Sequence, residues 1–195
     1  MRIYTKTGDT GRTGYLGKGR LAKDAPRICA LGSLDELNAS IGMVLAAPGL
    51  PAELTGPLQR IQNVLFDAGA ATASADAQSG AVLLDAETLW LERLIDRTEE
   101  QLPPLDRFIL PGGTASGATL HWSRTMARRA ERELVRAFAK NPKRGALLRY
   151  INRLSDALFV LARFANRLGG VAESIWEPEA SPSQAGASGR EGKRS

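Results

Sequence analysis

The feature that most constrains the fold is a regular spacing of apolar residues that recurs along the chain. Its clearest example has apolar residues spaced three, four, three, four and three positions apart, at Ile151, Leu154, Leu158, Leu161, Ala165 and Leu168. This spacing places them on one face of a helix with 3.6 residues per turn. Gly169-Gly170 follows directly and is predicted to end that helix. Because an amphipathic helix is stabilised mainly by packing, the chain must supply partner elements for this face.

The same spacing predicts two helices in the first half of the chain. The first runs from Pro26 to about Ala47, where Pro48-Gly49-Leu50-Pro51 ends it. The second is marked by apolar residues at Leu54, Leu58, Ile61, Leu65 and Ala68. Residues 73–81 are small and polar, so we expect a loop there.

Two more helices are predicted between this loop and the last helix. Asp85 is the predicted N-cap of the third helix, because aspartate accepts hydrogen bonds from free backbone amides. The apolar positions of that helix are Leu91, Leu94, Ile95 and Leu102, and Pro103-Pro104 stops it. The fourth helix is expected from about Ala115 to Ala139, ended by Asn141-Pro142.

Five amphipathic helices with almost no strand signal predict an all-α protein, a five-helix bundle. Residues 1–25 are predicted as an N-terminal loop rich in glycine and threonine. Residues 179–195 lack hydrophobic periodicity and are predicted as a disordered C-terminal tail. We therefore expect one helical domain over residues 1–178, followed by the tail.

Positive charge is concentrated in two segments. The net charge is +5, and the excess lies in residues 2–27 and between Arg124 and Arg149, where Glu131 and Glu133 alone oppose nine basic residues. Such clusters indicate a polyanionic partner: nucleotide phosphates, nucleic acid or an anionic membrane.

Cysteine and histidine usage excludes several kinds of site. Cys29 and His121 are the only residues of their types, so neither an internal disulfide nor a site rich in Cys or His can form. No secretory signal is evident, and no apolar run approaches the ~20 residues of a membrane span. We expect a soluble, cytoplasmic protein with no dedicated metal site.

Two segments have residue types suited to binding phosphate. The loop from Lys6 to Gly14 mixes glycines, which let backbone amides approach an anion, with threonine hydroxyls, and it lacks the Gly-Lys-Ser/Thr of a Walker A loop. In the fourth predicted helix, Arg124, Arg128, Glu131 and Arg132 share one face beside an apolar one. Guanidinium groups bind phosphate oxygens through paired donors.

Together with three further segments, these two resemble the PduO-type ATP:cob(I)alamin adenosyltransferases. The matching segments are residues 3–11, Gly32 to Asn38 (containing Leu-Asp-Glu-Leu-Asn), Phe108 to Gly113, Arg124 to Arg132, and Arg149 to Asp156. They occur in this order from Ile3 to about Pro178. The resemblance implies a homotrimer with active sites between subunits. It also implies transfer of the 5′-deoxyadenosyl group of ATP to cobalt(I) of a corrinoid, releasing triphosphate.

The resemblance also implies roles for individual residues. The ATP-binding positions it implies are Thr5, Lys6, Thr7, Gly8, Thr13, Gly14, Lys23, Arg128, Arg129, Glu131, Arg132 and Asn152. Phe108 takes the aromatic position on the corrinoid side, and Asp35 and Arg124 match residues that pair across the subunit interface. Arg128, Phe108, Asp35 and Arg124 are thus the predicted catalytic group. ATP, Mg²⁺ and cobalamin are the expected ligands, and a flavoprotein reductase is the expected electron donor.

Two other classes of protein would explain part of the pattern. A helical nucleic-acid-binding protein accounts for the arginines but assigns no role to the Gly/Thr-rich loop. A purely structural trimeric bundle accounts for the apolar stripes but for neither basic cluster. We therefore expect no nucleic-acid or membrane partner.

Overall fold

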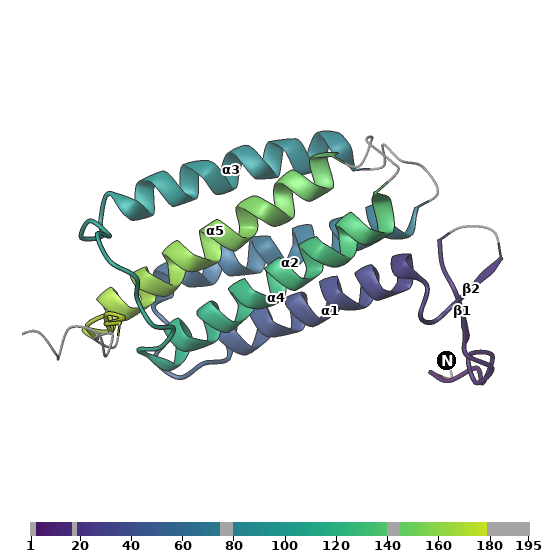
Figure 1. Ribbon diagram of the computed structural model, residues 1–195, viewed down its shortest axis with the longest axis horizontal. Coiled ribbons are helices and arrows are strands. Elements are labelled where there is room, and N and C mark those ends of the chain that lie inside the picture. Colours follow the sequence, from purple (N-terminus) through teal and green to yellow (C-terminus); the bar gives the residue numbers. More distant parts are fainter. Residues whose placement is uncertain (1–2, 17–18, 75–79, 140–144, 179–195) are drawn as a thin grey trace, which may run out of the picture.

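The computed structural model describes residues 3–16, 19–74, 80–139 and 145–178 and confirms the five-helix bundle (Figure 1). The helices are α1 Pro26–Leu45, α2 Ala52–Ala73, α3 Ala81–Glu99, α4 Ala115–Phe138 and α5 Gly145–Leu168. The predicted disordered tail and the proline predicted to follow the fourth helix lie outside the described residues.

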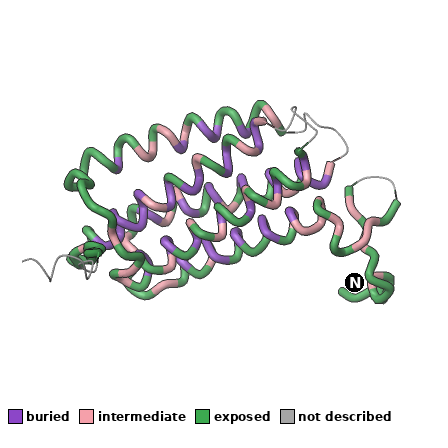
Figure 2. The backbone as a smooth tube through the Cα atoms, viewed as in Figure 1, coloured by how far each residue is buried: buried purple, intermediate pink, exposed green. Residues whose placement is uncertain are grey.

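The last helix, α5, forms the centre of the bundle. It packs along α4 and α3 and touches α2, while α1 packs against α4 and α2. Fifteen of the 24 residues of α5 are buried, and Figure 2 shows this buried stretch between its neighbours. The strong three-four spacing in the sequence is explained by this position, because α5 contacts several helices at once.

The start of the third helix differs from the prediction. Helix α3 begins at Ala81, after Gly80 in the left-handed conformation with φ 73°, so Asp85 lies inside the helix and is not its N-cap. Alanine and leucine in the preceding turn favour helix, and the Asp85 carboxylate accepts a 2.6 Å hydrogen bond from Arg149 of α5. Leu102 also lies outside the helix, which ends at Glu99.

The N-terminal segment contains a short hairpin that the sequence pattern did not predict. Strand β1 (Arg12–Gly14) pairs antiparallel with β2 (Arg20–Ala22), with Arg12 opposite Ala22. Arg12 donates to the carbonyl of Arg20 at 2.6 Å, and Arg20 donates to that of Arg12 at 2.7 Å and also to that of Thr7. The hairpin lies beyond the N-terminal end of α1 (Figure 1).

Helix α1 is long and apolar enough, by length and composition, to cross a membrane. Its apolar residues Leu34, Leu37, Ile41 and Val44 are buried in the bundle core. Packing against α2 and α4 therefore accounts for its composition.

Two buried polar residues of α5 fix the long connection between α3 and α4. Arg163 donates to the carbonyl of Pro103 at 2.9 Å, where this connection starts. Asn166 donates to the carbonyl of Gly112 at 2.9 Å and accepts from the amide of Thr114 at 2.9 Å, where the connection ends. Because both ends are hydrogen-bonded to one rigid helix, the exposed middle of the connection is held in a defined place.

Candidate active site

The arginine face of α4 borders a cavity between three helices. Arg124 and Arg128 line it together with Asp156 and Phe159 of α5, and Glu99 closes it from α3; its volume is about 280 Å³. The apolar residues Ala127, Ala130 and Leu134 on the other side of α4 are buried, as the spacing predicts.

Arg124 is the most constrained cation of this cavity. Its Nε atom is buried and lacks a hydrogen-bond partner in the described part of the chain. Its guanidinium lies 6.0 Å from the centre of the Phe159 ring. Burial and, secondly, the nearby charge of Arg128 lower the pKa of Arg124. Two cations and the two carboxylates of Glu99 and Asp156 thus line one cavity, and Arg124 and Arg128 form no ion pair among the described residues.

Glu131 and Asn152, two of the ATP-binding positions that the resemblance implies, lie side by side. Asn152 of α5 donates to the Glu131 carboxylate of α4 at 2.9 Å. Arg132 donates to the backbone carbonyl of Arg128 at 3.1 Å. Four of the predicted ATP-binding residues, Arg128, Glu131, Arg132 and Asn152, therefore lie on neighbouring turns of two packed helices.

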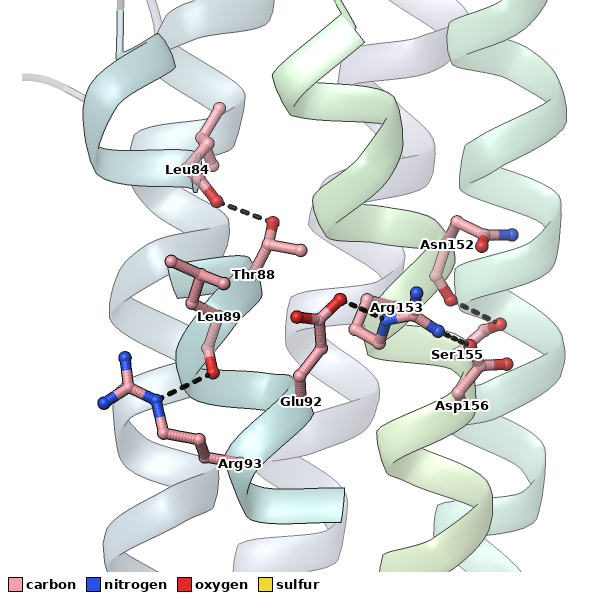
Figure 3. Close-up of polar contacts among 9 residues, drawn as sticks. All are labelled: Leu84, Thr88, Leu89, Glu92, Arg93, Asn152, Arg153, Ser155 and Asp156. Carbon is pink, nitrogen blue, oxygen red and sulfur yellow. Dashed lines mark hydrogen bonds and ion pairs between the residues drawn. The ribbon is translucent and has the colours of Figure 1, made fainter. Parts of the chain in front are cut away.

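Arg153 of α5 links helix α3 to Asp156, which lines the cavity. Arg153 donates to Glu92 of α3 at 3.1 Å and to Asp156 at 2.8 Å (Figure 3). Ser155 donates to the carbonyl of Asn152 at 2.9 Å. These contacts fix the orientation of Asp156, which faces Arg124 and Arg128 across the cavity.

The loop before the hairpin has features of an anion-binding segment. Lys6 has φ 62°, a left-handed conformation that is uncommon for a residue with a side chain. The hydroxyls of Thr5 and Thr7 are 2.8 Å apart, and a Cβ on Gly8 would lie 3.4 Å from Nζ of Lys23. Backbone strain of this kind is concentrated at ligand sites. The loop thus places a lysine amine beside a stretch of accessible backbone.

Neighbouring residues of α4 reach different sides of the bundle. Whereas Arg128 lines the cavity against α5, Arg129 forms a 2.9 Å ion pair with Glu36 of α1. Arg129 and Lys23 line a second cavity of about 540 Å³ between the hairpin, α1 and α4.

A third cavity lies on the α1 and α2 side. It measures about 570 Å³, is mostly apolar, and is lined by Thr13 and Gly14 of the hairpin and by Asp35 of α1. Asp35 and Arg124 thus line different cavities, one beside α1 and α2 and the other between α3, α4 and α5. Within one chain, Thr13, Gly14 and Asp35 are therefore separated from Arg124 and Arg128.

Phe108 of the predicted catalytic group is strongly exposed. Its side chain is 78% exposed, in the middle of the connection that Arg163 and Asn166 hold. Its ring makes an edge-to-face contact with Trp176, with centroids 6.3 Å apart. With Leu110 and Trp176, each 48% exposed, it forms an exposed apolar surface of the kind that marks ligand-binding and interaction sites.

Comparison with known proteins identifies the family. The family model described as cobalamin adenosyltransferase matches residues 3–165. This chain belongs to the cobalamin adenosyltransferase family. A cobalamin adenosyltransferase of Cupriavidus metallidurans is 42% identical over 179 residues, covering 91% of this chain and 95% of that protein. A corrinoid adenosyltransferase of Bacillus subtilis is 41% identical over 184 residues, covering 92% and 94% of the two chains.

Solved cobalamin adenosyltransferase structures have the same fold. A variant of the PduO-type ATP:corrinoid adenosyltransferase from Lactobacillus reuteri, complexed with cobalamin and ATP, matches with a TM-score of 0.83 and 37% identity. The match covers 91% of this chain and all of that one. A second variant of that enzyme, complexed with ATP, matches with a TM-score of 0.84 and 38% identity. The resemblance inferred from five sequence segments is therefore confirmed.

Three residues of this adenosyltransferase fold escaped the sequence analysis. Arg163 and Asn166 lie within an apolar run of α5, and Trp176 follows that helix. Apart from Glu173, which pairs with Arg163, their partners lie about 50 to 70 residues away in sequence, so local spacing does not reveal them. Arg163 also lies on the face opposite the apolar stripe of residues 151–168, so the helical spacing predicts it to be exposed.

Proposed function

We propose that this protein transfers the 5′-deoxyadenosyl group of ATP to the cobalt(I) of a corrinoid, giving adenosylcobalamin and inorganic triphosphate. The observation that carries the proposal is similarity over 91% of the chain to an enzyme solved with cobalamin and ATP.

The protein need not supply a nucleophile. The cobalt(I) electron pair forms the bond to the 5′ carbon of ATP, and the bond between that carbon and the triphosphate oxygen breaks. The leaving triphosphate gains negative charge, which fixed cations and backbone amides stabilise. Arg128 and Arg132 supply guanidinium groups, and Lys6 and Lys23 supply amines beside the loop amides.

We assign the Mg²⁺ in this reaction to the triphosphate oxygens, as part of the substrate MgATP. Within the described ranges, no three His, Cys, Asp or Glu side chains gather in a way that would hold a metal ion. A magnesium ion that is bound mainly by phosphate oxygens and water fits this residue inventory.

The complete site is proposed to form between two copies of the chain in a homotrimer. Thr13, Gly14 and Asp35 line one cavity, whereas Arg124 and Arg128 line another on a different side. A neighbouring copy that docks its arginine face onto the first cavity would unite the two groups. Asp35 of one copy would then neutralise Arg124 of the next.

Phe108 is proposed to lie against the corrinoid. There, its ring would exclude water and the lower axial ligand from cobalt, which makes cobalt(II) easier to reduce. A flavoprotein reductase is the proposed source of the electron, and the cytoplasm the proposed location.

The test is direct. The purified protein is mixed with chemically reduced cobalamin and MgATP, and the conversion of the cobalt(I) spectrum to that of adenosylcobalamin is followed together with triphosphate release. We expect both products in equal amounts. A protein that forms neither product but binds DNA with a strong salt dependence would support the nucleic-acid alternative instead.

A further inference from the structure

Phe108 does not stand alone on the surface. Residues 108–110 pair with residues 174–176, which follow α5. The amide of Leu110 donates to the carbonyl of Ser174 at 2.8 Å, and that of Trp176 donates to the carbonyl of Phe108 at 2.8 Å. Ile109 and Ile175 form the antiparallel bridge between them. Two segments far apart in sequence therefore present Phe108 and Trp176 side by side.

The segment that carries Trp176 is anchored to the same residue as the connection that carries Phe108. Arg163, which is 4% exposed, donates to both carboxylate oxygens of Glu173 at 2.8 and 3.2 Å and also to the carbonyl of Pro103. Bidentate bonds between arginine and a carboxylate in a buried place are strong and directional. Arg163 of α5 therefore anchors both the connection that carries Phe108 and the segment that carries Trp176.

The side chain of Phe108 has little else to hold it. It is 78% exposed, and Trp176 is its only aromatic contact in the part of the chain that the structure describes. An exposed phenylalanine samples several rotamers unless a neighbour favours one of them. The edge-to-face contact with the indole ring supplies this preference.

We propose that Trp176 is a positioning residue that holds the Phe108 ring at the axial face of the corrinoid. The inference rests on the function proposed above and extends it to the segment after α5. Trp176 acts through Phe108: without the indole, Phe108 occupies other rotamers for part of the time, and the axial ligand of cobalt returns.

The test compares Trp176→Ala, Trp176→Phe and Phe108→Ala with the wild-type protein. We expect Trp176→Ala to lower kcat for corrinoid adenosylation about three- to tenfold, with an unchanged KM for ATP. It should also reduce the fraction of cobalt(II) that loses its axial ligand, read from its absorption spectrum with MgATP bound. Trp176→Phe, which retains a ring, should recover most of both properties.

A double-mutant cycle tests the dependence on Phe108. In the Phe108→Ala background, Trp176→Ala should cause almost no further loss of kcat. Val171→Ala is the matched control, because Val171 is an exposed apolar residue of the same segment, 41% exposed, before the Glu173 anchor. Thermal unfolding of each variant shows whether the fold is retained.

Three results would overturn the inference. These are a wild-type kcat in Trp176→Ala, losses that add in the double variant, and an equal loss in Val171→Ala. Failure of the proposed function looks different, because the wild-type protein itself would then form no adenosylcobalamin.

Discussion

At the scale of single residues, Arg128 and Arg129 show how one helix serves two surfaces. Arg129 is compensated by Glu36 at 2.9 Å, whereas Arg128 faces a cavity that it shares with a second cation, Arg124. Because Arg128 forms no ion pair among the described residues, its guanidinium is free to bind phosphate oxygens. Arg128 is therefore the residue through which we expect triphosphate binding to be most easily disrupted.

Arg128→Ala should impair ATP use strongly while leaving the fold intact. Loss of one charged contact in a desolvated site costs about 2–4 kcal/mol, or ~30–1000-fold in kcat/KM for ATP. Arg93→Ala is the control, since the exposed side chain of this α3 arginine bonds only the carbonyl of Leu89 in its own helix among the described contacts (Figure 3). Comparable losses in the two variants would contradict the assignment.

His121 is a buried titratable group beside this cavity. It is 2% exposed, both ring nitrogens lack partners in the described part of the chain, and its ring contacts Phe159 with centroids 5.8 Å apart. Burial and, secondly, the charge of Arg124 lower the pKa of His121, and Glu173 opposes this weakly. The imidazole is consequently held in its neutral form in the folded protein.

The lowered pKa predicts a pH dependence of stability. Because the unfolded chain takes up a proton near pH ~6.5 and the folded protein does so only at lower pH, the stabilising contribution is present above pH ~6.5 and is lost as the pH falls below it. From about pH 7.5 to about pH 5.5, the free energy of unfolding of the wild type should fall relative to that of His121→Leu, by at most ~1.4 kcal/mol per pH unit. Denaturant titrations of both proteins at each pH measure these free energies. If the free energies of unfolding of the two proteins change with pH in parallel, the pKa of His121 is not lowered by folding.

At the scale of elements, Asn166 joins α5 to the start of α4. Its Oδ1 accepts from both the amide and the hydroxyl of Thr114, at 2.9 and 3.1 Å. Thr114 also caps α4, because its hydroxyl accepts from the amide of Gly117 at 3.0 Å. A Cβ on Gly117 would overlap Oδ1 of Asn166. Glycine is needed here for close approach, although alanine is the better helix former.

Gly117→Ala should therefore destabilise the protein by about 1–3 kcal/mol, because Asn166 must move and release its partners. Gly42→Ala in α1 is the matched control: its Cβ would only touch the flexible Gln62 side chain at 3.4 Å. We expect that substitution to stabilise by ~0.5–1 kcal/mol through helix propensity. Denaturant unfolding compares the two; equal effects would show that the Asn166 contact does not limit position 117.

The same elements show how far sequence reasoning reaches. Apolar spacing predicted all five helices, because burial on one face is a local and periodic signal. The prediction that Asp85 caps the third helix was wrong. In sequence, an aspartate at a helix end cannot be told from one that pairs with an arginine of another helix. The family resemblance predicted Glu131 and Asn152 as ATP-binding positions, but not the hydrogen bond between them. That bond and the contact between Phe108 and Trp176 join chain segments that only the folded bundle brings together.

The N-terminal loop is the element we expect ATP to change. Few backbone hydrogen bonds hold it in the structure, among them Asp9 to Lys6 at 3.4 Å and Gly11 to Gly8 at 3.2 Å. Phosphate contacts should offset the entropy that its glycines lose on ordering. Amide hydrogen exchange across residues 5–13 should slow when MgATP is added, while exchange in α2 stays constant. Unchanged protection at saturating MgATP would remove the loop from the proposed site.

At the scale of the whole molecule, the proposed site is divided between two surfaces of each chain. Asp35 is exposed on α1 and Arg124 is half-buried on α4, and neither takes part in an ion pair among the described residues. One negative and one positive group, each without a partner of opposite charge, are suited to meet across an interface between copies. Assembly and catalysis should consequently depend on the same pair.

Asp35→Ala and Arg124→Ala should each slow corrinoid adenosylation, and the double variant should lose less than the sum of the two, because either single change leaves the other charge uncompensated. Light scattering should give three times the 20.9 kDa chain mass for the wild type and a lower average mass for the single variants. The control pair is Asp85 and Arg149, an exposed ion pair of 2.6 Å within one chain, whose removal should change neither mass nor turnover. A monomeric wild type, or losses from Asp35→Ala and Arg124→Ala that simply add, would refute a site shared between subunits. Coupled losses accompanied by a change in mass would support it, since a contact confined to one chain has no reason to alter assembly.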